Sequence, residues 1–253
     1  MAENMINQKE VRYSEKYLYE FFKSLKPKEK RNIGLMGGWA VYFLLKKMDI
    51  DHIGSRDIDI FFNPEEISFQ DLVKKVESQG FQPHSTFRWA RYVQYSTQKE
   101  LTETKSKKVP IYDLITVYLD ISCPKKINKR IMYIPIIDKI FNGENILVKF
   151  RGLEILIPSS KIMMEMKLNS VTTRTDTFKR EKDLTDIFSL VYYDDSNWYI
   201  KNGNRIRTEG INRKLIKNFQ SKITNFTRDG TIINASKMIK VSPESIINLL
   251  KKM

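Results

Sequence analysis

Residues 33–62 read IGLMGGWAVYFLLKKMDIDHIGSRDIDIFF, and we expect the rest of the chain to be arranged around them. The first apolar run ends in the pair Gly37 and Gly38, and an apolar segment over 39–48 follows. The stretch closes on the alternating sequence DIDIFF at 57–62. These changes of pattern predict a short strand, a helix and a second strand.

Two carboxylates, Asp57 and Asp59, alternate with Ile58 and Ile60 in the closing segment. Because the side chains of a strand alternate between its two faces, both acids are expected on one face. Like charges that close repel each other unless a cation lies between them. Mg²⁺ takes carboxylate oxygens together with substrate phosphates, so the stretch predicts a metal and phosphate site.

The glycine pair lies where the predicted strand turns into the predicted helix. Without Cβ atoms, the amides of Gly37 and Gly38 could approach a phosphate at the positive end of that helix. Alone the pair is weak evidence, because many strand–helix turns carry glycine for packing. The two acids that begin 19 residues after Gly38 make the pattern more specific.

A third carboxylate is expected, because two metal ions that grip a triphosphate usually need one. Asp120 is the best candidate, since it lies in an apolar strand predicted over 109–122, where an ionised aspartate is costly unless it is paired or metal-bound. Asp113 is its rival, but the separation of seven residues is odd and puts Asp113 on the opposite face of a continuous strand. A charge at a solvent-exposed strand edge is the alternative for Asp120.

Composition narrows the class of protein. The chain has 253 residues and one cysteine, Cys123, which excludes an intramolecular disulfide framework and favours a reducing cytoplasm. No apolar run reaches the roughly 18 residues of a membrane span, and the N-terminus has no signal-peptide pattern. We therefore expect a cytoplasmic protein without membrane segments. Its two histidines, His52 and His84, are too few for a histidine-rich zinc site.

The net charge of +14 favours a nucleic acid or a nucleotide polyphosphate as partner, since clustered cations neutralise phosphates. However, only 13 of the 44 cations are arginines, and isoleucine and asparagine are also abundant. An A/T-biased coding sequence produces this composition whatever the protein does. The charge therefore supports a phosphate partner mainly in combination with the motif.

The chain divides into an α/β part, 1–157, and a helical domain, 158–253. Amphipathic patterns predict helices over 11–26, 160–168, 180–192, 211–223 and 243–252. Serine N-caps are expected at Ser14, Ser68, Ser160 and Ser242. Further strands are expected over 81–95, 131–137, 146–150 and 153–157, with a solvated turn over 26–31 and an exposed loop over 98–108.

Together these motifs resemble the DNA polymerase β-like nucleotidyltransferase superfamily, whose pattern is a glycine turn, a DxD strand and a third acid on a neighbouring strand. More narrowly, GGWA at 37–40 and RDIDI at 56–60 look like the AbiEii/AbiGii toxin group of nucleotidyltransferases. SKIMMEMKL at 160–168 and REKDLTDI at 180–187 are similar to two helices of that group. The resemblance covers about residues 31–192.

The resemblance implies a polymerase β-like core with a mixed sheet, followed by a C-terminal helical domain. It implies an enzyme that moves NMP from an NTP to an acceptor hydroxyl, with two Mg²⁺ ions, or Mn²⁺, held by Asp57, Asp59 and Asp120. Lys167 would reach the triphosphate and Asp183 would lie near the site. The acceptor stays open between tRNA, another RNA, a protein and a small molecule, and so does an antitoxin partner for this toxin-like enzyme.

Two other functions remain open. One is a module of the same fold that binds nucleotide or RNA without chemistry, although all three acids are present. The other is a small-molecule transferase that modifies antibiotics, which would need an acidic acceptor pocket that a chain of +14 disfavours. The acids at 183 and 186 could also be an ordinary charge pattern on a surface helix. Trp39, Trp89, Trp198 and the methionines of 163–166 are expected in the core.

Overall fold

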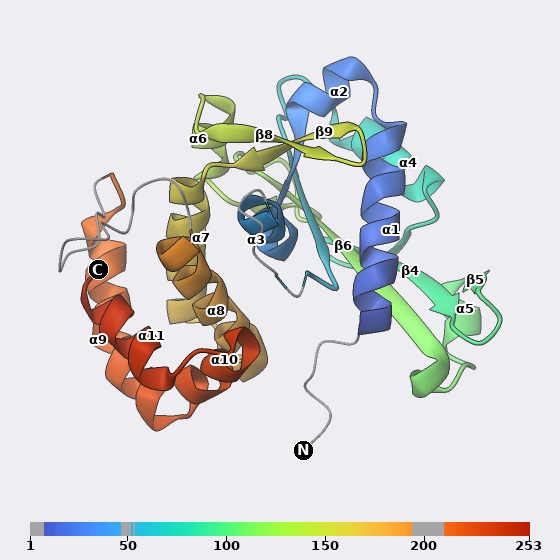
Figure 1. The fold of residues 1–253 in the computed structure, drawn as a ribbon. Coiled ribbons are helices and arrows are strands. Elements are labelled where there is room, and N and C mark those ends of the chain that lie inside the picture. Colours follow the sequence, from blue (N-terminus) through green and yellow to red (C-terminus); the bar gives the residue numbers. More distant parts are fainter. Residues whose placement is uncertain (1–7, 47–51, 53, 194–209) are drawn as a thin grey trace. The chain divides into compact units, whose positions relative to one another are not determined.

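The computed structural model describes residues 8–46, 52, 54–193 and 210–253 (Figure 1). The chain divides into two compact units, which are described separately below. Unit 1 comprises Met1–Ala40 and Ile53–Pro158, and unit 2 comprises Val41–His52 and Ser159–Met253. The expectation that 1–157 and 158–253 are separate domains stays a prediction.

In unit 1, nine strands of the described chain form one sheet in the order β3-β4-β6-β2-β1-β9-β8, with β5 paired to β4 and β7 to β6. The strands are β1 (Ile33–Met36), β2 (Ile58–Phe62), β3 (Gln82–Ser85), β4 (Arg88–Gln94), β5 (Lys99–Leu101), β6 (Leu114–Cys123), β7 (Met132–Tyr133), β8 (Asn145–Phe150) and β9 (Leu153–Pro158). Strand β2 runs parallel to β6 and β1 runs parallel to β9, whereas β1 and β2 are antiparallel. The predicted α/β class with a mixed sheet is confirmed.

The centre of the sheet supplies the core of unit 1. Ile58 and Ile60 of β2 are fully buried, because the alternation of the strand turns both toward the same covered face. Trp39 and Trp89 are buried as expected, and the indole Nε1 of Trp39 donates to Ser14 Oγ at 2.9 Å. Trp198 lies outside the described residues.

Helices cover the sheet of unit 1. They are α1 (Gln8–Ser24), α2 (Pro27–Asn32), α4 (Phe69–Ser78), α5 (Glu103–Ser106), α6 (Ile137–Phe141) and the one-turn 3₁₀-helix η1 (Ile111–Asp113). Helix α1 lies along the sheet against β6 and β9 and buries Tyr17, Leu18 and Phe21 there (Figure 1). Helix α3 (Gly37–Lys46) follows β1 directly.

Several local predictions for unit 1 are wrong. Ser14 is no N-cap, because α1 begins at Gln8 and Ser14 is a buried residue inside the helix. The segment predicted as a solvated turn over 26–31 forms α2. Proline occupies the first turn of α2, where its missing N–H costs nothing, and the Glu29 carboxylate accepts from the Lys26 backbone N–H at 2.6 Å.

The predicted loop over 98–108 contains the edge strand β5 and the short helix α5. The sequence did not predict these two elements because their residues are mostly charged or polar. An edge strand and a surface helix need few apolar residues. The strand predicted over 109–122 begins later, at Leu114, since η1 precedes it. By contrast, the helix capped by Ser68 is confirmed, with Ser68 Oγ accepting from the Asp71 backbone N–H at 3.1 Å.

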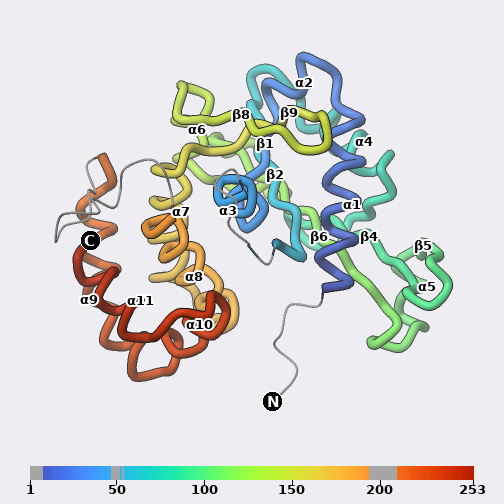
Figure 2. Tube along the Cα trace, viewed as in Figure 1, coloured from blue at the N-terminus to red at the C-terminus, as the bar shows by residue number. Residues whose placement is uncertain are grey.

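Unit 2 is helical (Figure 2). It contains the end of α3 from Val41 on, and the helices α7 (Ser160–Thr173), α8 (Thr177–Tyr193), α9 (Arg213–Arg228), α10 (Thr231–Ile239) and α11 (Pro243–Lys251). The N-cap of α7 is Ser159 and not the predicted Ser160, and α10 was not expected. Leu168, Ile187 and Phe219 are fully buried between the helices. No helix among the described residues has the length and apolar character that a membrane span requires.

Candidate functional site

Three adjacent strands bring the candidate acids of unit 1 together. In the parallel pair of β2 and β6, Asp59 lies directly opposite Asp120. On the other side of β6, the antiparallel strand β4 places Arg88 opposite Asp120. Asp59, Asp120 and Arg88 therefore form one row across three strands of the sheet. The guanidinium of Arg88 was not predicted, and it lies beside the two predicted acids.

Asp57 belongs to the same group, although it lies outside the strand. Strand β2 begins at Ile58, so Asp57 occupies the bend that enters it. The Nη2 atom of Arg88 lies 3.9 Å from Asp57 Oδ2, and the Asp57 side chain is 26% exposed. All three predicted acids thus lie around Arg88. We call Asp57, Asp59, Asp120 and Arg88 the acid cluster.

Arg88 binds Asp120 in a bidentate ion pair. Its Nε donates to Asp120 Oδ1 at 2.7 Å and its Nη2 donates to Asp120 Oδ2 at 2.6 Å. This geometry gives two parallel charge-assisted hydrogen bonds, which are stronger than neutral ones. The hydrogen bond to Asp120 raises the pKa of Arg88 against the opposing effect of burial, and the charges of Asp57 and Asp59 raise it further. Arg88 is therefore a permanent cation.

The glycine turn lies against the acid cluster. Met36, the last residue of β1, is opposite Asp59 in the antiparallel pair of β1 and β2. The next residue, Gly37, has a φ of +68°, and a Cβ atom there would lie 2.8 Å from Asp59 Cγ. Only glycine therefore combines this backbone conformation with room for the carboxylate. Gly38 is the buried second residue of α3.

The donor chemistry of the acid cluster suits a hard divalent cation such as Mg²⁺, since three carboxylates supply only oxygen ligands. Among the described residues, however, no group of three or more His, Cys, Asp or Glu side chains has a geometry that could hold a metal ion. Arg88 supplies the positive charge instead, because both oxygens of Asp120 bind its guanidinium. Since each carboxylate oxygen has a second lone pair, a metal ion could bind Asp120 beside Arg88 or in its place.

Lys167 and Asp183 lie in unit 2, in a buried ion network. The Nζ atom of Lys167 lies 2.8 Å from Asp183 Oδ1 and 2.6 Å from Asp186 Oδ2. His52 Nε2 lies 3.0 Å from the second oxygen of Asp186. Only 9% of the Lys167 side chain is exposed, so its ammonium group is enclosed by its partners. The role of Lys167 as a triphosphate ligand stays a prediction, and it would require Lys167 to exchange these partners.

Ser170 and Arg174 complete the network on Asp183. Ser170 Oγ donates to Asp183 Oδ2 at 2.7 Å, and Arg174 Nε lies 3.1 Å from the same oxygen. Asp183 and Asp186 are almost fully buried, so the alternative of an ordinary surface charge pattern is wrong. The nucleotide-binding role of Asp183 stays a prediction.

The charges of the network shift the pKa values of its members. Burial acts to raise the pKa of Asp186, but the charge of Lys167 and the hydrogen bond from His52 outweigh it, so that pKa lies below its ordinary value. Burial likewise acts to lower the pKa of Lys167, and Asp183 and Asp186 together raise it above the ordinary value. Both groups are therefore ionised at neutral pH.

Asp113, the rival to Asp120, is not part of the acid cluster. It ends η1, where its carboxylate accepts from the Ser96 backbone N–H at 2.7 Å and from Gln94 Nε2 at 2.9 Å. The hydrogen bond from Gln94 and those from Ser96 lower the pKa of Asp113 against a small effect of burial. The prediction that Asp113 lies on the opposite face assumed one continuous strand through Asp113 and Asp120. That assumption is wrong, because the strand begins at Leu114. The expectation that Asp113 lies away from the other acids nevertheless agrees with the structure.

No family model and no curated protein matches the chain. Among solved structures, the chain is similar to the crystal structure of an antigenic nucleotidyltransferase-like protein from Paracoccidioides brasiliensis, with 15% sequence identity and a TM-score of 0.46. The match covers 94% of this chain and 95% of that one. A likeness of this degree assigns neither a fold nor an activity by itself.

Proposed function

We propose that this protein is a metal-dependent nucleotidyltransferase that moves NMP from an NTP to an acceptor hydroxyl. The observation that carries the proposal is the register of the sheet. It places Asp59 beside Asp120 on neighbouring strands, and it places the glycine turn at Gly37 against Asp59. Facing carboxylates next to a strand–helix turn without side chains suit a triphosphate that enters with divalent cations.

Each residue of the cluster has a role in this proposal. Asp57 and Asp59 would hold two Mg²⁺ ions, and Asp120 would share one of them. Bound Mg²⁺ would neutralise charge on the triphosphate and lower the pKa of the acceptor hydroxyl. Asp120 would orient that hydroxyl and accept its proton. The amides of Gly37 and Gly38 would donate to the phosphates at the beginning of α3.

In this proposal Arg88 gives up Asp120 when the substrate and its metal ions bind. Its guanidinium binds both oxygens that the proposal assigns to the metal and to the acceptor. After release, Arg88 would still lie beside the cluster as a cation that can face the phosphates of the substrate. We therefore assign Arg88 two successive partners, Asp120 in the protein without substrate and a phosphate group in the loaded protein.

The test is transfer of label from α-labelled NTPs in the presence of Mg²⁺ and total RNA. We expect labelled RNA with the natural chain and none with the double variant Asp57→Ala, Asp59→Ala. Asp113→Ala is a matched control, because Asp113 is an aspartate of the same unit that lies outside the cluster. Label transfer that is unchanged by the double variant would contradict the proposal.

A second function is favoured by one observation. Arg88 already offsets one of the three negative charges of the cluster and binds both oxygens of Asp120, an arrangement that suits a protein that binds nucleotide or RNA without chemistry. Such a protein would bind nucleotide equally well without its acids. Calorimetric titration of ATP into Asp59→Asn, with and without Mg²⁺, distinguishes the two functions, since only the transferase should lose the Mg²⁺-dependent part of its affinity.

The finer identity of the enzyme rests on the sequence resemblance alone. We extend the proposal on that basis to an RNA acceptor such as tRNA, to a role as a toxin and to a partner antitoxin. Cytoplasmic location is a prediction that rests on the single cysteine, Cys123, and on the absence of a signal-peptide pattern.

A further inference from the structure

The last three helices of unit 2 carry an excess of positive charge. Residues 210–253 contain nine Lys and Arg against two Asp and Glu. Residues 159–193, which form α7 and α8, contain six cations and five acids. The C-terminal 44 residues therefore account for half of the net charge of +14. A/T-biased coding would spread lysines over the chain and does not explain this concentration.

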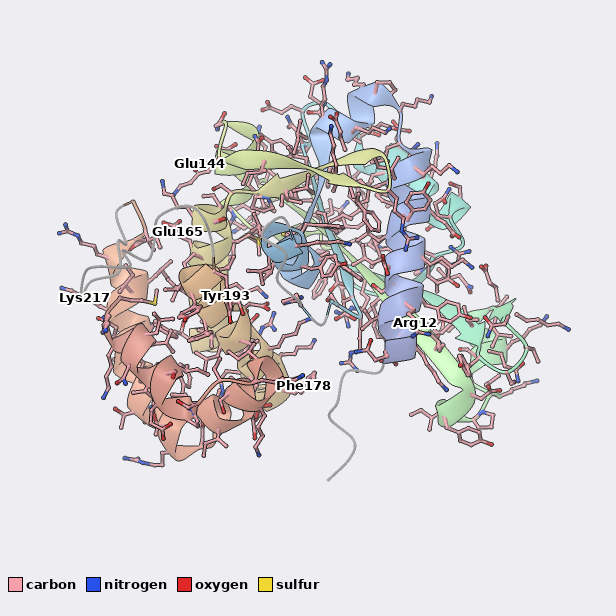
Figure 3. All side chains as sticks on the ribbon, viewed as in Figure 1. Arg12, Glu144, Glu165, Phe178, Tyr193 and Lys217 are labelled. Atoms are coloured by element: carbon pink, nitrogen blue, oxygen red, sulfur yellow. The ribbon has the colours of Figure 1, made fainter. Side chains whose placement is uncertain are left out.

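Helix α9 presents much of this charge to solvent. One side of the helix is apolar and buried against other helices of unit 2. The other side carries only polar side chains, among which the cations Arg213, Lys214, Lys217 and Arg228 are exposed. Figure 3 shows Lys217 at the outer edge of α9. We call this side the α9 outer face; its members are Arg213, Lys214, Lys217, Asn218, Ser221, Thr224, Asn225, Thr227 and Arg228.

Carboxylates do not neutralise the α9 outer face. The helix contains no Asp or Glu, and none of its four exposed cations forms an ion pair within the part of the chain that the structure describes. The buried acids of α7 and α8 bind inside unit 2. Glu165 accepts from the Asn212 backbone N–H at 2.9 Å, and Glu181 accepts from Asn234 Nδ2 at 2.6 Å.

The composition of the face indicates which polyanion it fits. Lys, Arg, Ser, Thr and Asn are the side chains that most often contact phosphate oxygens in protein–nucleic acid complexes. The face has no exposed aromatic side chain to stack on bases, so it would contact the backbone alone. It also has no exposed apolar side chain to enter a lipid bilayer, which disfavours a membrane.

We infer that the α9 outer face binds the phosphate backbone of a nucleic-acid strand. From Arg213 to Arg228 the helix is about 22 Å long, at roughly 1.5 Å per residue, which is enough to meet several successive phosphates. Binding of this kind does not involve the acid cluster and goes beyond the proposed function. Only the further step, that the bound strand is the acceptor, rests on that function.

The test measures binding of fluorescent 20-nucleotide RNA and DNA strands to the full chain by anisotropy, without NTP or metal, from 50 to 300 mM salt. The variant is the triple substitution Lys214→Gln, Lys217→Gln, Arg228→Gln, which keeps side-chain length close to the original. The control is Lys105→Gln, Lys108→Gln, Lys129→Gln, which removes the same charge from exposed positions of unit 1. Circular dichroism checks that both variants are folded.

We expect the α9 variant to lose at least about tenfold in affinity at 100 mM salt, while the control stays within about twofold. Each phosphate contact adds about 0.7 to the slope of log affinity against log salt for a single strand, so three lost contacts should make the slope shallower by about 2. Equal losses in both variants would overturn the inference, since net charge would then explain binding. So would binding to anionic lipid vesicles but to neither strand.

The RNA and DNA arms identify the strand. Equal binding of both supports contact with the backbone alone, and tighter binding of RNA supports the same contact with added 2′-hydroxyl bonds. Asp59→Asn should bind both strands like the natural chain. If strands bind but no label is transferred, the proposed function fails and this inference stands. If label is transferred but the α9 variant binds strands normally, this inference fails and the proposed function stands.

Discussion

Arg88 and Asp120 determine, at the scale of single residues, which state the acid cluster adopts. Two hydrogen bonds between opposite charges, each worth about 1.5–3 kcal/mol, hold Asp120 on the guanidinium. Any cation that binds Asp120 competes with them. If the cluster binds metal ions as proposed, Arg88 would lower that affinity while it stabilises the metal-free protein.

The variant Arg88→Gln tests this competition. Its metal-free form should melt at a lower temperature, because Asp120 loses its partner while it stays largely buried. Added Mn²⁺ should then raise the melting temperature more than it does for the natural chain, and affinity for Mn²⁺ in calorimetry should rise by about tenfold, which corresponds to about 1.4 kcal/mol.

Arg91→Gln is the matched control for that experiment. Arg91 lies on the same strand β4 and is similarly buried, but its partners are Glu20 and Glu100. Its loss should lower the melting temperature without any additional response to Mn²⁺. A response to Mn²⁺ that is the same in both variants would contradict the assignment of Arg88 as the competing cation.

The buried network of unit 2 makes stability depend on pH. Because the pKa of Asp186 is lower in the folded protein, its ionised form stabilises the fold above its ordinary value of 3.8, and this contribution is lost as the pH falls toward the lower folded pKa. We predict that the unfolding free energy of the natural chain falls steeply below about pH 4. Asp186→Asn should lose about 3–5 kcal/mol at neutral pH and show a shallower decline in acid.

Chemical denaturation at pH 7, 4 and 3 measures this effect. Asp176→Asn is the control, since Asp176 is an exposed aspartate of the same unit. If Asp186→Asn changed stability by the same amount at all three values, the folded pKa of Asp186 would not be depressed.

Sequence patterns predicted the acids better than their partners. The DxD spacing and an aspartate inside an apolar strand sufficed to select Asp57, Asp59 and Asp120, which the structure brings together. Arg88 could not be selected, because its proximity to Asp120 depends on β4 pairing with β6, and strand order is not a local property. The sequence offered a signal for Arg88 in its position at the start of an apolar strand, next to Trp89 and Ala90.

At the scale of elements, the turn from β1 into α3 has a narrow sequence requirement. Gly37 has positive φ and also leaves room for Asp59. Gly152, in the turn between β8 and β9, has a φ of +81°, but a Cβ atom added there would meet no other atom within 4 Å. The two glycines therefore share the backbone requirement and differ in their surroundings.

Alanine substitutions at these two glycines should differ accordingly. Gly152→Ala should cost about 1–2 kcal/mol, the strain of a left-handed conformation. Gly37→Ala should cost a further 1–3 kcal/mol, roughly the effect of overpacking, because Asp59 must move. Urea unfolding measures both values, and equal costs would show that the carboxylate of Asp59 does not require glycine at this turn.

Helices and strands with a clear apolar pattern in the sequence were predicted well. Those that depend on pairing or packing with other elements were not. Strands β1, β2 and β6 follow from their apolar residues, and helix α4 follows from its N-cap at Ser68. Strand β5 and helix α5 are rich in charge, and only pairing with β4 and a cap at Thr102 define them. Tertiary context overrides composition at such positions.

At the scale of the whole molecule, charge is divided unequally along the chain. The acid cluster lies in unit 1, most acids of α7 and α8 are buried inside unit 2, and the excess of cations lies in the C-terminal helices. The composition indicated the total charge but not this distribution, because burial of carboxylates cannot be counted from a sequence. The distribution favours a protein that handles a small phosphate substrate and a long phosphate chain with different surfaces.

The most direct test of the central claim compares α-labelled and γ-labelled ATP, CTP, GTP and UTP in parallel reactions with total RNA and Mg²⁺. The account predicts that at least one nucleotide transfers its α-label to RNA while its γ-label appears as pyrophosphate, and that Asp59→Asn abolishes both. Transfer of the γ-label to RNA, or the same products from Asp59→Asn, would contradict it.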